Sequence, residues 1–407
     1  MIKKTIAIIG GGPAAMLLAA TLDKDKFAVA IYERNSALGR KLLVAGEGGL
    51  NLTHSEETEK FISRYTPASF FAKIIPAFSN RDLRNWLASI GIGTFIGSSK
   101  RVFPEKGIKP IDVLTALLEI LKKNNVAINT QHLWKGWTPG NELIFAADDQ
   151  TTAVNADIVV FALGGASWQA TGSDGAWTNY FSAKGIEIVP FQASNCAYEV
   201  KWGEKFIETA AGRALKNIVL KCEDQEKKGE VIITRFGLEG GAIYALSPQL
   251  RKQLNENKTA QLFIDLKPQL SSEQIKDRFA RRGKRSIKEL LIEKLHLDDT
   301  QIELLKTLLP KDEFTNLELL AGKLKNLPLA ISAAAPIDEA ISTVGGISLD
   351  EIDENFQLKK LSRHYALGEM LDWDAPTGGY LLQGCFSMGY YLGRILNDIP
   401  PINQCDW

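Results

Sequence analysis

Cysteine and histidine are scarce in this sequence. Four of each occur in 407 residues, and Cys196, Cys222, Cys385 and Cys405 form no C-x-x-C pair. This spacing indicates neither a zinc site nor a redox dithiol, so we expect no metal site and a reduced, cytoplasmic setting. The chain also lacks an H-x-x-x-H pattern, a nucleophile elbow and a P-loop lysine. These absences argue against a zinc protease with that motif, an α/β-hydrolase and a P-loop nucleoside triphosphatase.

The sequence also lacks net charge and long apolar runs. Lys and Arg number 48, as do Asp and Glu, so no global electrostatic attraction favours a nucleic acid or an anionic membrane as partner. No stretch approaches the roughly 20 apolar residues of a membrane span. The apolar N-terminal run is broken by three glycines and a proline, which argues against a signal peptide.

The N-terminal segment KTIAIIGGGPAAMLLAATL predicts a strand, a tight turn and a helix. The β-branched run ending at Ile9 leads into Gly10-x-Gly12-x-x-Ala15, the dinucleotide-binding fingerprint in its expected context. Gly10 permits the turn, Gly12 lets the backbone approach a pyrophosphate, and Ala15 is small enough for the helix to pack on the strand. The helix N-terminus would then hold the phosphates.

A second apolar strand ends in an acidic residue. The run Phe27–Glu33 places Glu33 23 positions after Gly10, close to the spacing of about 20 at which a carboxylate reaches the ribose diol. Both FAD and NAD carry an adenosine ribose, so this acid does not choose between them.

The segment GRKLLVAGEGGLNLTH, residues 39–54, follows the acid directly. A glycine-dense loop of this kind suits close approach of a ligand to the backbone. A flavin has a ribityl arm and a broad ring for the chain to cover, whereas NAD gives no evident reason for such a loop. We therefore interpret the segment as a flavin cover, with an ordinary solvated turn as the alternative.

These residues resemble a family of bacterial FAD-dependent flavoproteins, the aminoacetone oxidase and bile-acid enone reductase-like proteins. The family carries the segment G-R-K-x-L-x-S-G-G-G-R-C-N-x-T-N after its FAD fingerprint. The matches here are Gly39, Arg40, Lys41, Leu43, Gly46, Gly48, Asn51 and Thr53, and the departures are Ala45, Glu47, Gly49, Leu50 and His54. Gly49 and Leu50 stand where the family has Arg and Cys, so any role of those two residues beside the flavin is absent here. Such departures are typical of a side branch of the family.

The resemblance returns three times along the chain. ADIVVFALGGASWQATGSDG (156–175) resembles the family's second FAD segment, TRFGLEGGAIYALS (234–247) its T-H-F-G element, and TVGGISLDEI with HYALGEMLDWDAPTGGYLLQGCFSMGYYLG its C-terminal cofactor segment. The resemblance implies an FAD-containing oxidoreductase with a substrate domain inserted into the FAD domain. The resemblance does not indicate which substrate this protein uses.

The later segments also support a flavin site independently of the family resemblance. Asp157–Gly165 is an apolar run closed by glycines, typical of a buried parallel strand. A helix beginning at Gly378–Leu381 would aim N–H groups at the pyrimidine edge of the flavin. The expected cofactor-binding residues are Gly10, Gly12, Pro13, Ala14, Ala15, Glu33, Arg34, Arg40, Lys41, Gly46, Gly48, Asn51, Leu163, Gly164, Gly165, Gly368, Glu369, Gly378, Gly379, Tyr380 and Leu381.

The length favours two or three structural units. We expect a doubly wound, Rossmann-like α/β FAD-binding domain from residues 1–192 and 336–407. An inserted domain, residues 193–335, would be β-rich over 193–267 and helical over 268–335, where Ser271 and Gln274 form a capping box. Its boundary with the FAD domain would form the substrate cleft.

We therefore predict two-electron transfer between a small organic substrate and the flavin, with NAD(P)H visiting transiently or dioxygen as redox partner. The catalytic acid or base is unassigned; His54 and Asn51 are candidates. Two alternatives remain: an RNA-modifying flavoprotein, favoured by the basic run Arg278–Lys288, and a flavin-binding electron carrier. Charge runs on helices are usually solvated, so nucleic acid is the less favoured partner. The oligomeric state stays open.

Overall fold

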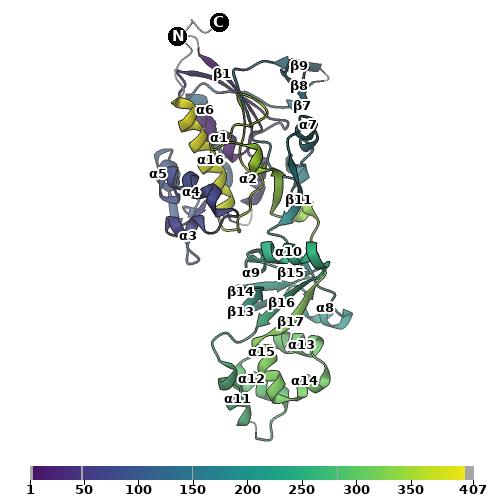
Figure 1. Ribbon diagram of the computed structural model, residues 1–407. Coiled ribbons are helices and arrows are strands. Elements are labelled where there is room, and N and C mark those ends of the chain that lie inside the picture. Colours follow the sequence, from purple (N-terminus) through teal and green to yellow (C-terminus); the bar gives the residue numbers. More distant parts are fainter. Residues whose placement is uncertain (1–2, 47–48, 149, 282, 399–407) are drawn as a thin grey trace. The chain divides into compact units, whose positions relative to one another are not determined.

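The computed structural model describes residues 3–46, 49–148, 150–281 and 283–398. The chain divides into two compact units (Figure 1), each described by itself below. Unit 1 is discontinuous and comprises residues 1–192 and 341–407, whereas unit 2 is the continuous range 193–340.

Unit 1 is built on a five-stranded sheet whose neighbouring strands are all parallel. Apolar strands buried on both faces are typical of such a sheet, and every residue of β10 is buried. This confirms the predicted α/β class with a parallel sheet. In spatial order the strands are β20 (His364–Ala366), β10 (Ile158–Phe161), β1 (Lys4–Ile9), β2 (Phe27–Tyr32) and β6 (Ala127–Asn129).

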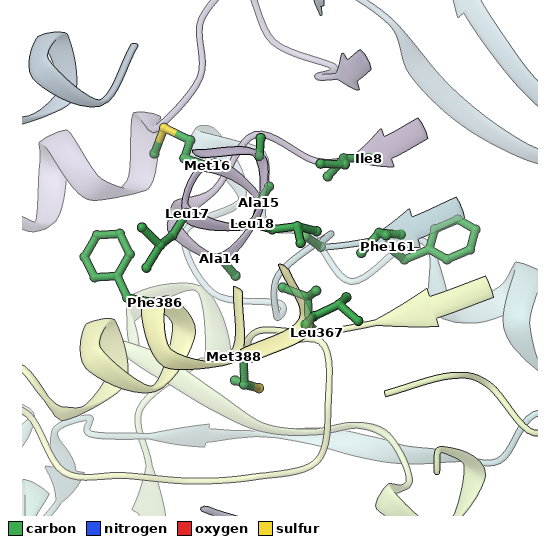
Figure 2. Packing of buried hydrophobic residues seen from close by; sticks show 14 of the residues in the cluster. Ile8, Ala14, Ala15, Met16, Leu17, Leu18, Phe161, Leu367, Phe386 and Met388 are labelled. Atoms are coloured by element: carbon green, nitrogen blue, oxygen red, sulfur yellow. The ribbon is translucent and has the colours of Figure 1, made fainter. Parts of the chain in front are cut away.

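Three helices pack beside this sheet. The first, α1 (Pro13–Thr21), contacts both the C-terminal helix α16 (Tyr380–Asn397) and α6 (Pro110–Lys123). Figure 2 shows α1, which carries Ala14, Leu17 and Leu18, next to α16, which carries Phe386 and Met388; Ile8 and Phe161 from the sheet belong to the same cluster. The two ends of the chain's sequence thus share one apolar core.

Smaller elements complete unit 1. A three-stranded sheet joins β3, β5 and β4, a meander joins β7, β8 and β9, and β11 pairs with β19. Their bounds, with those of the remaining helices, are α2 (Arg40–Ala45), β3 (Thr53–His54), α3 (Thr58–Ile62), α4 (Ala68–Ala77), α5 (Asn80–Ser89), β4 (Thr94–Ile96), β5 (Arg101–Pro104), β7 (Leu133–Trp137), β8 (Leu143–Ala147), β9 (Gln150–Val154), η1 (Gln169–Thr171), α7 (Thr178–Ala183), β11 (Ile188–Ser194), β19 (Ser342–Ile347) and η3 (Leu349–Glu351).

Unit 2 contains a seven-stranded antiparallel sheet in the order β17-β16-β13-β14-β15-β12-β18. Only Ser332 separates β17 from β18, so one chain segment forms both edges and the sheet closes on itself. The strands are β12 (Tyr198–Glu199), β13 (Ala214–Cys222), β14 (Gln225–Ile233), β15 (Gly237–Glu239), β16 (Ala260–Asp265), β17 (Leu327–Ile331) and β18 (Ala333–Ala334).

The helices of unit 2 lie partly where strands were expected. Three of them interrupt the section 193–267, and a cluster of five follows before the chain returns to the sheet at β17. The prediction of a purely helical section 268–335 therefore missed β17 and β18, because short apolar runs fit strand and helix equally. The helices are α8 (Glu204–Ala210), α9 (Gly241–Tyr244), α10 (Ser247–Asn257), α11 (Ser272–Ala280), α12 (Ile287–Leu295), α13 (Asp299–Leu308), α14 (Lys311–Thr315), α15 (Leu317–Lys325) and η2 (Ile337–Glu339).

Candidate flavin site

The turn between β1 and α1 brings the backbone against the next strand. Gly10 has φ +102°, and a Cβ there would overlap the carbonyl oxygen of Ala162 just after β10. Only glycine both adopts this positive φ without strain and lacks the Cβ that would clash. Gly12 caps α1, and a Cβ on it would meet no described atom within 4 Å. The helix therefore begins at Pro13 facing open space, where its N–H groups and dipole suit an anion.

Glu33 lies directly beside this turn. Its Oε2 accepts a hydrogen bond from the N–H of Gly11 at 2.9 Å, and its Oε1 accepts from the backbone and side chain of Asn35 at 2.8 and 2.7 Å. The residue is only 9% exposed. Such contacts fix a carboxylate at the end of β2, at the position that the fingerprint assigns to ribose binding.

Two arginines predicted to contact the cofactor are engaged with the protein. Arg34 forms an ion pair with Asp174, Nη1 to Oδ2 2.7 Å, and Arg40 donates to Oδ1 of Asn35 at 2.9 Å. Asn35 in turn donates to the carbonyl oxygen of Thr171 at 3.2 Å. These bonds join the loop after β2 to the segment after β10, so both arginines also have a structural role.

Lys41 lies at the centre of a second network. Its Nζ donates to Oε2 of Glu369 and to Oγ of Ser167, both at 2.9 Å. Oε1 of Glu369 accepts the N–H of Thr343 at 3.1 Å, and Thr343 Oγ1 accepts the N–H of Ala166 at 3.2 Å. Helix α2 is thereby tied to the segments that follow β10 and β20.

These groups surround a cavity of about 500 Å³ in unit 1, within the size range of nucleotide and drug sites. Sequence reasoning missed part of its wall, such as Trp134 of β7 and Tyr180 of α7, because neither segment carries a recognisable motif. The predicted residues that line the cavity are Gly10, Gly12, Pro13, Ala14, Glu33, Arg34, Arg40, Lys41, Leu163, Gly164, Gly368 and Glu369.

Two predicted cofactor residues have packing roles instead. Ala15 is fully buried in the core against which α1 packs. A Cβ on Gly165 would overlap Oγ1 of Thr343, so this glycine allows β19 to approach. Neither residue lines the cavity.

The N-terminus of α16 forms a second group of predicted residues, outside the cavity lining. Gly378 and Gly379 have φ +107° and +99°, and a Cβ on Gly379 would lie 2.5 Å from the Cα of Thr53 in β3. The paired glycines thus let the helix begin directly on that strand. Leu381, in the first turn, is half-buried against the core of unit 1.

Tyr380 anchors this helix start. Its hydroxyl donates to Oε2 of Glu56 at 2.7 Å, its carbonyl accepts from Tyr65, and Arg64 makes a bidentate pair with Glu56 at 2.9 and 2.6 Å. Burial alone would raise the pKa of Glu56, but hydrogen bonds from Arg64 and Tyr380 lower it from 4.5 to about 2. Burial and the Glu56 carboxylate raise the pKa of Tyr380.

His54, a candidate catalytic residue, is held by the same group. Its ring stacks on Tyr380 with centroids 5.1 Å apart, and Nδ1 accepts the N–H of Glu56 at 3.2 Å. Burial lowers its pKa, which favours the neutral ring at pH 7. The residue is 9% exposed. These contacts support a structural role, and a catalytic one stays untested.

Asn51 leaves a polar atom without a partner. Its amide donates to the carbonyl of Gly49 at 3.3 Å, whereas Oδ1 is buried and accepts from no described residue. Ser173, in the cavity wall, likewise has a buried Oγ without a described partner. Buried polar atoms are rarely left unsatisfied, so both point to a polar ligand.

The glycine-rich segment 39–54 is not one continuous loop. Residues Arg40–Ala45 form α2, because Gly39 at φ +69° starts a helix there. Gly46 has φ −85°, in the right-handed region, and a Cβ there would meet Pro110 at 2.5 Å. Gly48 lies outside the described residues.

None of the helices within 3–46, 49–148, 150–281 and 283–398 combines the length and apolarity that crossing a membrane requires. The same ranges contain no group of three or more His, Cys, Asp or Glu side chains arranged to hold a metal ion.

FAD fits this arrangement. The open helix start at Gly12 suits a pyrophosphate, Glu33 suits a ribose, and the unsatisfied atoms of Ser173 and Asn51 offer polar contacts. One dinucleotide turn and one ribose acid are expected for a single cofactor of this kind.

Comparisons with known proteins find the following similarities. The family described as HI0933-like protein Rossmann domain matches residues 4–395. A 3-dehydro-bile acid delta(4,6)-reductase of Clostridium scindens is 25% identical, over 97% of this chain and 99% of that protein. A ribosomal RNA dihydrouridine synthase of Haemophilus influenzae is 23% identical, over 94% and 96%. The structure of a 3-ketosteroid delta1-dehydrogenase from Sterolibacterium denitrificans overlays with TM-score 0.49 at 13% identity, over 97% and 100%.

The predicted resemblance is thus confirmed: the chain belongs to the HI0933-like Rossmann-domain family, and its cofactor is FAD.

Proposed function

We propose that this FAD-dependent oxidoreductase transfers two electrons between its flavin and a small organic molecule with an apolar, planar body. The flavin supplies the redox chemistry when bound, and the protein positions it. The observation that carries the proposal is the cavity formed by the dinucleotide turn, Glu33 and the Lys41–Glu369 pair. The bile-acid reductase named above, aligned over almost the full chain, supports an organic substrate.

An exposed aromatic surface supports the substrate class. Phe95 of β4 is 46% exposed and stacks on Phe103 of β5, with ring centroids 5.6 Å apart. Exposed apolar groups that gather in one place commonly mark a ligand or partner surface, and stacked rings suit a flat apolar molecule.

Two redox partners are compatible with this site. One dinucleotide fingerprint and its ribose acid are assigned to FAD, so NAD(P)H would visit the flavin transiently, or dioxygen would reoxidise it. The reduced, cytoplasmic setting expected from the cysteines remains a prediction.

Anaerobic flavin bleaching tests the proposal. The holoenzyme is mixed with NADH, NADPH, or candidate amine and steroid donors, and absorbance near the visible flavin maximum is followed. We expect bleaching by one of these, and recovery of the colour on adding an enone or dioxygen. If none of them reduces the flavin, and the chemically reduced flavin returns electrons only to artificial acceptors, the protein is instead an electron carrier.

Modification of RNA is the second candidate function. Two curated relatives are named ribosomal RNA dihydrouridine synthases, from Haemophilus influenzae and Escherichia coli, and the basic run Arg278–Lys288 lies at α11–α12. However, Arg285 pairs with Glu293 at 2.6 Å and Lys288 with Asp299 at 3.3 Å, as on an ordinary solvated surface. Tight RNA binding that weakens steeply with salt would favour this candidate; its absence at low salt would exclude it.

A further inference from the structure

Arg101, which sequence reasoning did not single out, lies at the start of α16. It opens β5, where it stands opposite His54 of β3, while Phe103 stands opposite Phe95 of β4. Residues opposite one another in antiparallel strands share a face, as do alternate residues of one strand. Arg101 therefore lies on the face that carries His54 and the Phe95–Phe103 pair.

The side chain of Arg101 reaches the paired glycines before α16. A Cβ on Gly378 would lie 3.1 Å from Nε of Arg101 and 3.7 Å from its Cζ. The guanidinium thus occupies the space beside Gly378 that any other residue would fill. Gly378 immediately precedes Gly379, which caps the 18-residue helix.

This position is electrostatically unfavourable without an anion. The N-terminus of a helix carries a partial positive charge, so a cation there is repelled. Within the described ranges, no hydrogen bond or ion pair holds the Arg101 guanidinium. In contrast, Arg34, Lys41 and Arg64 each have a carboxylate partner within 3 Å.

A second observation points to a ligand at the same place. The Oδ1 of Asn51 is buried without a described partner, two residues before the β3 strand on which Gly379 packs. A cation with no partner among the described residues, a helix N-terminus and an unsatisfied side-chain amide are thus all on or next to strands β3 and β5. Together they suit a planar group with both an acceptor edge and a donor, and the pyrimidine ring of a flavin is such a group.

We propose that Arg101 contacts the pyrimidine edge of the flavin and, together with the α16 N-terminus, stabilises the negative charge that the N1–C2=O region gains when the flavin accepts an electron pair. A fixed cation and helix dipole aimed at developing charge are an effective electrostatic arrangement. This inference rests on the FAD chemistry of the proposed function, but not on its substrate or redox partner.

Sulfite binding tests the role without any turnover. The sulfur lone pair of sulfite forms a bond to N5 of oxidised flavin, and the electron pair displaced into the ring places negative charge at N1–C2=O. The dissociation constant is read from the loss of visible absorbance. We expect Arg101→Gln to retain FAD and to weaken sulfite binding roughly ten- to hundredfold, the scale of a lost charge-assisted hydrogen bond. Its reduction potential should fall in parallel.

Two further variants complete the experiment. Arg101→Lys keeps the charge and should keep most of the sulfite affinity. Arg81→Gln removes a guanidinium whose ion pair with Glu57 is largely exposed, and should behave as wild type. Wild-type sulfite affinity and potential in FAD-loaded Arg101→Gln would overturn the proposal. If that variant loses FAD, retention of FAD and sulfite affinity in Arg101→Lys supports the charge role, and loss of FAD in both overturns it. A substrate screen that fails would leave these outcomes unaffected.

Discussion

The carboxylate of Glu33 and the backbone N–H of Gly11 are joined by a hydrogen bond of 2.9 Å. This bond fixes the acid at the end of β2 beside the turn that precedes α1, although 22 residues separate the two in the chain. The position of the predicted ribose acid therefore depends on the same turn that would receive the pyrophosphate.

The first prediction concerns this acid. Glu33→Ala removes the Gly11 contact and a charge-assisted hydrogen bond to the ribose, which should cost roughly 1.5 to 3 kcal/mol of FAD binding, or about one to two decades in affinity. Titration calorimetry of the apoprotein with FAD measures the change. Glu59→Ala, at an exposed position of α3, is the control. Equal FAD affinity in the two variants would refute the ribose assignment.

A second prediction follows from the pKa of Glu56. The folded carboxyl has a pKa of about 2, below its ordinary 4.5, so its contribution to stability is complete above pH 4.5 and is lost as the pH falls from 4.5 toward 2. Glu56→Gln should lower the free energy of unfolding by roughly 2 to 3 kcal/mol at pH 7. The difference from wild type should shrink between pH 4.5 and 3, as measured by urea unfolding. A difference that does not depend on pH would contradict this account.

The third prediction concerns the contact between α1 and α16. A Cβ on Gly389 would overlap the carbonyl oxygen of Ala14 and lie 3.0 Å from the N of Leu18. Backbone atoms cannot move aside as side chains do, so Gly389→Ala should destabilise by roughly 1 to 3 kcal/mol despite the better helix propensity of alanine. It should also weaken FAD binding, because α1 begins at the phosphate site.

Gly322 of α15 provides the matched control. It is exposed, and a Cβ there would meet no described atom within 4 Å. Gly322→Ala should be neutral or stabilise by up to about 1 kcal/mol. Thermal unfolding of Gly389→Ala and Gly322→Ala measures the difference. Similar transition temperatures in the two variants would mean that α1 and α16 move apart at little cost.

A fourth prediction uses Asn51. Its unsatisfied Oδ1 would orient one edge of the flavin, so Asn51→Leu should retain FAD while shifting the visible spectrum or the reduction potential. Asn257→Leu, at an exposed position near the end of α10, should leave both unchanged. If Asn51→Leu also matches wild type in both properties, Asn51 does not contact the ring.

The parallel sheet could be predicted because its determinants are local. A β-branched run, glycines at fixed spacing and an apolar helix specify β1, the turn and α1, and the acid at the end of β2 follows by the same spacing. The start of α16 was also predictable from the Gly378–Gly379 pair. In each case, neighbouring residues carry the information.

The remaining features arise from contacts between distant segments. Glycine density at 39–54 predicted a loop, but Gly39 at φ +69° is followed directly by helix α2. Arg101 gave no signal, because its place depends on the pairing of β5 with β3 and on the approach of Gly378. The part of the cavity wall formed by β7 is likewise set by tertiary packing.

The discontinuous course of unit 1 has a consequence for biosynthesis. Strand β10 receives its partner β20, and α1 receives α16, only from the last part of the chain. While a ribosome is still making unit 2, the nascent chain exposes an unpaired β10 edge and the apolar side of α1, both hazards for aggregation. Unit 2 is continuous, so it can fold before β10 and α1 receive these partners. Chaperone binding to translation-arrested chains should therefore end only when residues up to the end of α16 have emerged from the ribosome.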